Sequence, residues 1–163
     1  MSYKIIAKYS NQLSDDEWKT IKESFNLVFE KDFDLEYFKS KYCLNILGFS
    51  CHGILYNDNL IVGCFTILPR IYNFFGTKKL IGVGADAFIL KDHRVDAFFL
   101  KKMSESIISK FAEFGINSFI SLPTLSNPYR YWKLIAKWQH IGELDYYIFP
   151  VNIGKIIFKR SVL

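Results

Sequence analysis

The middle of this sequence, residues 52–90, limits the choice of fold more than any other part. It reads HGILYNDNLIVGCFTILPRIYNFFGTKKLIGVGADAFIL, is rich in β-branched and aromatic residues, and carries turn signals at 57–59 and 75–77. Apolar runs separated by such short turns predict antiparallel strands, here at about 52–57, 60–74 and 78–90. Pro69 lies inside the second run and favours a bulge or an edge position, because proline has no N–H for the ladder.

Helical patterns precede this strand-rich middle. Residues 3–8 predict a short first strand, and Ser14 with Glu17 then forms the signature of a capping box. Apolar side chains recur behind it at helical spacing and predict a helix over 15–30. Asp34 is placed to cap a shorter second helix.

Helices and strands alternate in the rest of the chain. Apolar side chains four residues apart predict a helix over about 94–114, with Gly115 as its C-cap. The compact run INSFISLP predicts a strand at 116–123, and Asn127, followed by Pro128, begins another helix. Two further strands are predicted at 140–152 and 154–159. The order β-α-α-β-β-β-α-β-α-β, with a final β, predicts one α/β (α+β) domain over residues 1–163, whose mixed, mostly antiparallel sheet carries helices on both faces.

Composition narrows the function classes. The chain has 163 residues, half of them apolar, and no apolar run approaches the ~18 residues of a membrane span, so we expect a soluble cytoplasmic protein without membrane insertion. The formal net charge of +5 suits an anionic, phosphate-rich ligand. Because Lys and Arg are scattered, nucleic-acid binding is disfavoured. Cys43, Cys51 and Cys64 show no C-x-x-C spacing, and no spacing of His, Asp or Glu indicates a metal.

Three stretches together resemble the GNAT acyltransferase superfamily. VGADAFILKDHRVDAFFLKKM resembles its fourth strand, pyrophosphate loop and third helix, and NLIVGCFTILP a strand that often reads "ivG". SLPTLSNPYRYWKLIAKWQHIGELDYYIFP resembles its fifth strand, fourth helix and sixth strand, with Asn127 at the helix-opening Asn. The resemblance covers about residues 53–150. The family loop reads Gln/Arg-x-x-Gly-x-Gly/Ala, whereas here Arg94 is followed by Val95, Ala97 and Phe99 near the small positions. Three alternatives follow: the loop takes a different path, the cofactor is displaced, or binding is lost.

The resemblance implies that acetyl-CoA or another acyl-CoA binds along the fourth strand and at the start of the following helix. The expected cofactor-binding residues are Phe88, Ile89, Leu90, His93, Arg94, Val95, Asp96, Ala97, Phe98 and Asn127. Unpaired N–H groups and the helix dipole favour an anion at that helix start, and Arg94 can fork onto a phosphate. The alternative is a helix simply capped by Asp92 or Asp96.

Candidate catalytic residues come from the same segments. Asp86 interrupts the apolar strand GVGADAFIL, where a carboxylate is costly unless it is paired or lies in a cleft. It is our candidate for the general base or the amine anchor, and an ion-paired strand Asp is the alternative. Tyr131, then Tyr129, are the candidates for a general acid, although aromatic residues on that helix can equally belong to the core. Cys51 and His52 are neighbours in a strand, so their side chains point to opposite faces and cannot readily cooperate.

The expected function is therefore an N-acyltransferase that moves an acetyl or other acyl group from acyl-CoA to a small amine by direct attack in a ternary complex. An amino sugar for surface-glycan synthesis is the preferred acceptor, by analogy alone. The alternative is a GNAT-shaped ligand-binding or regulatory module without catalysis. The C-terminal NIGKIIFKRSVL can pair with its own sheet or with the edge of a second subunit, which leaves a homodimer as one alternative.

Overall fold

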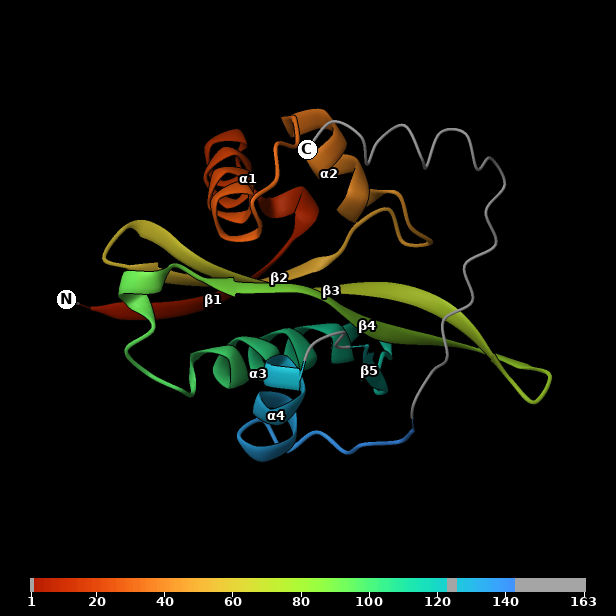
Figure 1. Cartoon of the computed structure of the whole chain (residues 1–163). Coiled ribbons are helices and arrows are strands. Elements are labelled where there is room, and N and C mark those ends of the chain that lie inside the picture. Colours follow the sequence, from red (N-terminus) through yellow and green to blue (C-terminus); the bar gives the residue numbers. More distant parts are fainter. Residues whose placement is uncertain (1, 123–125, 143–163) are drawn as a thin grey trace, which may run out of the picture.

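In the part of the chain that the structure describes, five strands form one sheet in the order β1-β2-β3-β4-β5 (Figure 1). The structure, a computed structural model, describes residues 2–122 and 126–142. Its strands are β1 (Tyr3–Tyr9), β2 (Cys51–Asn57), β3 (Leu60–Phe74), β4 (Thr77–Ile89) and β5 (Phe119–Ser121). Its helices are α1 (Asp15–Phe29), α2 (Leu35–Cys43), α3 (Phe99–Phe111) and α4 (Ser126–Leu134), with single 3-10 turns at Ser10–Gln12, Lys91–His93 and Ala112–Phe114.

The sheet is covered by helices on both faces. The pairs from β1 to β4 are antiparallel, and β5 joins β4 in parallel. In Figure 1, α1 and α2 lie on one face, and α3 and α4 lie on the other. This confirms the predicted mixed, mostly antiparallel sheet and the element order as far as α4. The predicted strand 154–159 and nearly all of 140–152 fall outside the described residues.

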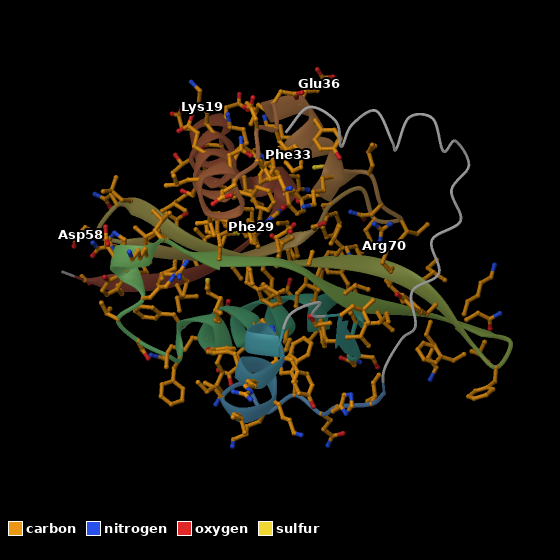
Figure 2. The ribbon with its side chains drawn as sticks, viewed as in Figure 1. Lys19, Phe29, Phe33, Glu36, Asp58 and Arg70 are labelled. Carbon is orange, nitrogen blue, oxygen red and sulfur yellow. The ribbon has the colours of Figure 1, made fainter. Side chains whose placement is uncertain are left out.

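Alternating strand residues build a separate core on each face. Ile54 is completely buried on the α1–α2 side, and its neighbour Leu55 is completely buried on the α3 side. Aromatic side chains fill the first core, where Phe25 contacts both Phe33 and Phe38. Figure 2 shows Phe33 within this helical layer, and Phe29 packs edge-on toward Phe88 of β4 at a centroid distance of 6.4 Å. Aromatic side chains of α1 and α2 thus form much of the core on this face of the sheet.

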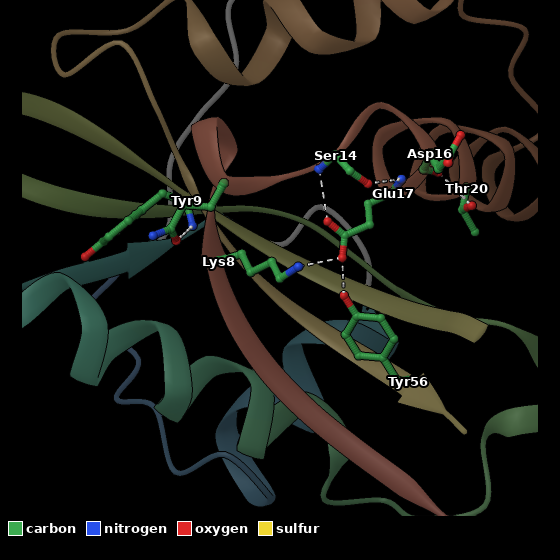
Figure 3. A network of polar contacts seen from close by, with 8 residues as sticks. Lys8, Tyr9, Ser14, Asp16, Glu17, Thr20 and Tyr56 are labelled. Atoms are coloured by element: carbon green, nitrogen blue, oxygen red, sulfur yellow. Dashed lines mark hydrogen bonds and ion pairs between the residues drawn. The ribbon is translucent and has the colours of Figure 1, made fainter. Parts of the chain in front are cut away.

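One carboxylate fastens α1 to the sheet. The predicted capping box forms: Glu17 N–H donates to Ser14 Oγ at 3.2 Å, and Ser14 N–H donates to Glu17 Oε2 at 3.0 Å (Figure 3). The other carboxylate oxygen accepts from Lys8 Nζ at 2.7 Å and from Tyr56 Oη at 2.6 Å. Burial raises the pKa of Glu17, but these hydrogen bonds outweigh burial, and the net pKa is lowered. Glu17 thus joins α1 to β1 and β2.

Two predicted boundaries were wrong. The helix expected from residue 94 begins at Phe99, because residues 91–93 form a 3-10 turn and Asp96 accepts from Phe98 N–H before the helix starts. The strand expected at 116–123 is confined to Phe119–Ser121. Gly115 lies in the left-handed region (φ 70°), as expected for a C-cap, and it caps the 3-10 turn Ala112–Phe114 that follows α3. Ile116 N–H bonds to Phe111 O, so Ile116 still belongs to the C-terminal end of this helical segment and not to the strand.

The distal parts of β3 and β4 form a two-stranded ribbon. The last β2 partner along β3 is Ile67, and β4 meets β5 only from Gly82 onward. Beyond these points, residues 70–74 pair with 77–81 alone among the described strands. Pro69 lies at this exit, past the last β2 pair, in agreement with the predicted edge position. Figure 2 labels Arg70 at the base of the ribbon, and Phe75 at its tip is fully exposed.

Candidate functional site

A bulge in β4 determines where the candidate base lies. Phe65 pairs with Ala87 and Ile67 pairs with Gly84, so one residue of β3 faces two of β4, Ala85 and Asp86. An extra residue breaks the alternation of side chains along a strand. Ala85 packs against the α1–α2 core, and Asp86 reaches the same helical layer. The bulge was not expected from the sequence, which reads as a regular strand there.

The carboxylate of Asp86 is held by two consecutive residues of α2. Tyr42 Oη donates to Asp86 Oδ2 at 2.7 Å, and Lys41 Nζ lies 2.6 Å from the same oxygen. The Asp86 side chain is 23% exposed and that of Lys41 33%. Burial, then the negative charge of Asp86, raise the pKa of Tyr42, so its hydroxyl stays protonated as a donor. The ion-paired alternative for Asp86 is therefore present, in a half-buried setting.

The Lys41 ammonium also faces aromatic rings. It lies 4.7 Å from the ring centroid of Phe25 and 5.3 Å from that of Tyr42. A carboxylate and two ring faces attract a cation by charge and by the ring quadrupole. We call Asp86, Phe25 and Tyr42 the ammonium cage. Tyr42 is almost completely buried on the inner face of α2, and nothing in the local sequence pointed to Lys41.

Past the bulge, β4 offers an open edge. Among the described residues β5 pairs with β4 only at Gly82, Val83 and Gly84. The two glycines allow this approach, since a Cβ on Gly82 would meet Phe119 Cδ1 at 2.4 Å. Gly82 and Gly84 thus leave the space that Phe119 and Ser121 of β5 occupy. From Ala85 to Ile89, β4 has no strand partner on the β5 side within residues 2–122 and 126–142. Apart from Ile89 O, which accepts from Arg94 Nε, the backbone groups directed to that side are available to a ligand.

Alternation along β4 distinguishes the three residues expected to bind the pantetheine arm. Leu90 N–H bonds to Val62 O and Leu90 O accepts from His93 N–H, so both of its backbone groups are used. In an antiparallel pair, alternate residues direct their backbone groups to opposite edges. Ile89 therefore faces the open edge, and its carbonyl accepts from Arg94 Nε at 2.8 Å. Phe88 shares the direction of Leu90 and buries its ring in the α1–α2 core.

The loop before α3 already contains an anion of its own. Asp96 Oδ1 accepts from Phe98 N–H at 2.7 Å, and Asp96 Oδ2 pairs with Lys102 Nζ at 2.9 Å. These hydrogen bonds, that of Lys102 foremost, lower the pKa of Asp96. Val95 is exposed, and His93 Nδ1 lies 3.1 Å from Tyr3 Oη. A phosphate at this helix start would take the place of the Asp96 carboxylate.

Tyr131 fixes the start of α3 from α4. Its hydroxyl donates to Ala97 O at 2.6 Å and accepts from Lys101 N–H at 3.0 Å. Burial raises its pKa. Tyr131 packs on the α3 side of the sheet, whereas Asp86 lies on the α1–α2 side. A substrate that met both side chains would have to pass through the open edge of β4. Asn127 is the second residue of α4, whose first residue is Ser126, one position before the predicted cap.

His52 and Cys51 are buried on different faces, as the strand geometry predicted. Cys51 belongs to the α3 core, and burial raises the pKa of its thiol to about 12. His52 Nε2 lies 2.8 Å from Ser10 Oγ, and Nδ1 lies 2.9 Å from Thr66 Oγ1. Burial lowers the pKa of His52 to about 3, so the imidazole is neutral. Both groups are parts of the interior.

None of the helices placed in 2–122 and 126–142 combines the length and apolar character needed to cross a bilayer. Over the same residues, no three His, Cys, Asp or Glu side chains gather in a way that could hold a metal ion.

Solved acetyltransferases share this fold. The aminoglycoside acetyltransferase meta-AAC0020, from an uncultured soil metagenomic sample and in complex with sisomicin, has a TM-score of 0.68 at 15% identity over 92% of this chain and 97% of that one. For AAC(6')-Ih from Acinetobacter baumannii the TM-score is 0.69 at 12% identity, over 93% and 100% of the two chains. AAC(6')-Iy, in complex with the bisubstrate analog CoA-S-monomethyl-acetylneamine, gives 0.72 at 9% identity, over 92% and 99%.

No protein-family model matches the sequence, and no curated protein matches it. At such low identities the structural likeness establishes the fold, which is the GNAT fold predicted from the sequence.

Proposed function

We propose that this protein is an acyl-CoA-dependent N-acyltransferase that acetylates a small amine. The observation that carries the proposal is the position of Asp86: a half-buried carboxylate on the bulge of β4, where the strand edge opens, already bound to an ammonium group. The GNAT-fold neighbours include acetyltransferases, and one of them is in complex with a bisubstrate analog of CoA.

Asp86 would bind the acceptor amine and take up its proton. In the proposed reaction, the amine nitrogen attacks the thioester carbonyl directly. Asp86 anchors the ammonium form and accepts a proton as the C–N bond forms. Backbone N–H groups on the open edge of β4, next to Ile89, would stabilise the developing oxyanion. Tyr42 supports the carboxylate by its hydrogen bond.

Binding of the acyl-CoA phosphates is proposed at the start of α3, with Phe98 N–H, Lys102 and Arg94. Arg94 is bound to Ile89 O, and Asp96 occupies the Phe98 N–H and Lys102. A phosphate has to displace Asp96, and Lys102 would then pair with the ligand. Tyr131 keeps this helix start in place, and its role as general acid stays a prediction.

An amino sugar is the first acceptor class to test. Two of the neighbours described above are aminoglycoside acetyltransferases, and aminoglycosides carry amines on sugars. We propose, by analogy alone, that this amino sugar belongs to surface-glycan synthesis. A panel of amino sugars, polyamines and amino acids with acetyl-CoA would rank the acceptors by turnover.

Acetyl-CoA binding together with turnover separates this function from the alternative of a module without catalysis, which the Asp96 carboxylate at the α3 start favours. Bound CoA without turnover of any acceptor would support the module. Acetyl-CoA at about 100 times its dissociation constant would stabilise the fold by ~2.7 kcal/mol. For a chain of this size that is a rise in Tm of about 5–10 °C. No rise with millimolar acetyl-CoA or CoA would contradict the proposal.

The role of Asp86 is tested by Asp86→Asn, with Asp58→Asn at the β2–β3 turn as the matched control. Turnover of the best acceptor should fall by ~10²-fold or more in Asp86→Asn while the acetyl-CoA thermal shift is kept. The control variant Asp58→Asn should keep both the turnover and the acetyl-CoA thermal shift of the wild type. Near-normal turnover in folded Asp86→Asn would remove Asp86 from the mechanism.

A further inference from the structure

Lys41 stands out among the described lysines by what its ammonium touches. It is 2.6 Å from the Asp86 carboxylate and lies over two aromatic rings. Lys39, on the same helix, offers a close comparison. It also ends 2.6 Å from a carboxylate and is also 33% exposed, but its partner Asp15 is 90% exposed, and no aromatic ring of the described residues faces its ammonium. Among the lysines of residues 2–122 and 126–142, Lys41 alone brings a primary amine to the bulge of β4.

The ammonium cage has the chemistry of an amine-recognition site. A half-buried carboxylate supplies charge, the ring faces of Phe25 and Tyr42 add cation–π attraction, and Tyr42 Oη fixes the carboxylate. In the proposed function, Asp86 holds the amine that is acylated. In this structure, the amine beside Asp86 is Lys41 Nζ of the same chain. An outside amine must displace it.

We propose that Lys41 is an internal acceptor, a modification site that is acylated in cis when acetyl-CoA is bound; this inference rests on the proposed function. The new C–N bond joins Lys41 Nζ to the thioester carbonyl carbon, and the C–S bond breaks. Of the two protons that the ammonium loses, one leaves to solvent through Asp86 and the other ends on the CoA thiolate. The products are acetyl-lysine 41, free CoA and one proton.

Acetylation would change the cage. The amide of acetyl-lysine carries no charge, so the ion pair with Asp86 and both cation–π contacts are lost. Asp86 keeps its hydrogen bond from Tyr42 and becomes available to an outside ammonium. The modified protein should therefore bind cationic acceptors better than the unmodified one, since Lys41 no longer competes for the carboxylate.

The test is to incubate the full chain with acetyl-CoA alone and follow acetylation of each lysine by peptide mass spectrometry. Lys41 should react at least about tenfold faster than Lys39, because a positioned intramolecular amine is favoured over a free one. The first-order rate constant should not depend on protein concentration. Asp86→Asn should slow the reaction by about 10²-fold. Lys41→Arg keeps the positive charge beside Asp86 without a primary amine, and should show no acetylation at residue 41.

Each result decides the proposal. Preferential acetylation of Lys41 at a concentration-independent rate supports it. Equal acetylation of Lys39 and Lys41 would indicate spontaneous chemistry and overturn it. Unmodified Lys41 in a protein that is stabilised by acetyl-CoA and acetylates an added amine would also overturn it, while the proposed function stands. Absence of both the thermal shift and any turnover would overturn the proposed function and this inference together.

Discussion

The buried His52 should make the stability of this protein depend on pH in a range where carboxylates do not titrate. Its ordinary pKa of 6.5 is lowered to about 3 by complete burial, so the folded state keeps the imidazole neutral while the unfolded chain takes up a proton. Stability from this group is fully present above pH 6.5 and is lost as the pH falls toward 3. Each pH unit in between costs about 1.4 kcal/mol.

Between pH 7 and pH 5 the predicted loss is about 2 kcal/mol. Urea unfolding at the two pH values measures it, and with a slope near 2 kcal/mol/M the midpoint should fall by about 1 M. His52→Gln is the comparison, because glutamine can bond to Ser10 and Thr66 but does not titrate. His93 and His140 remain in both proteins, so their contributions cancel.

The variant should show a smaller loss of stability between pH 7 and pH 5 than the wild type, by about 2 kcal/mol. An equal loss in the two proteins would refute the reasoning. If the variant does not fold, the imidazole signal of His52 in the wild-type NMR spectrum gives the same answer: it should not move between pH 7 and pH 5. A midpoint near 6.5 would show that the ring is solvated.

Three substitutions test other contacts. Gly53→Ala places a Cβ 2.7 Å from Met103 O of α3 and should destabilise the fold by about 1–3 kcal/mol, measured by urea unfolding. An unchanged unfolding midpoint would mean that α3 can shift away from β2 at no cost. Ser14→Ala removes the α1 cap and should cost about 1 kcal/mol by the same assay, whereas no cost would mean that Glu17 alone secures the helix start. Tyr131→Phe removes two hydrogen bonds at the start of α3 and should cost about 1–2 kcal/mol with turnover reduced less than about tenfold. A far larger loss of turnover at saturating acetyl-CoA would give the hydroxyl the acid role.

Short sequence motifs predicted the helix ends and the strands, because caps, turns and apolar runs depend on residues close together in the sequence. Ser14 and Glu17 marked the start of α1 because a capping box needs only residues three apart, and both of its hydrogen bonds form. Gly115 marked the end of the 3-10 turn that follows α3, because a left-handed cap favours glycine. Apolar runs and turns located β2, β3 and β4 to within a few residues.

Long-range contacts account for what the sequence did not show. The bulge at Ala85 and Asp86 is defined by pairing with β3, and no residue of β4 marks it. Asp86 was recognisable as a carboxylate in an apolar strand, but its partner Tyr42 is 44 residues away in sequence. Lys41 resembles every other surface lysine until α2 packs on the sheet. The late start of α3 follows from the 3-10 turn at 91–93. The spacing of apolar residues does not reveal such a turn.

The ribbon of residues 70–74 and 77–81 should make amide exchange uneven along β4. An isolated two-stranded hairpin is marginally stable, so its amides should exchange by local opening well before the molecule unfolds. That opening should stop at Gly82, whose N–H bonds to Ser118 O and where β5 begins to pair. Local opening would thus be confined to the ribbon. The pairing of β4 with both β3 and β5 would keep the register of β4 next to Asp86 while the hairpin tip frays.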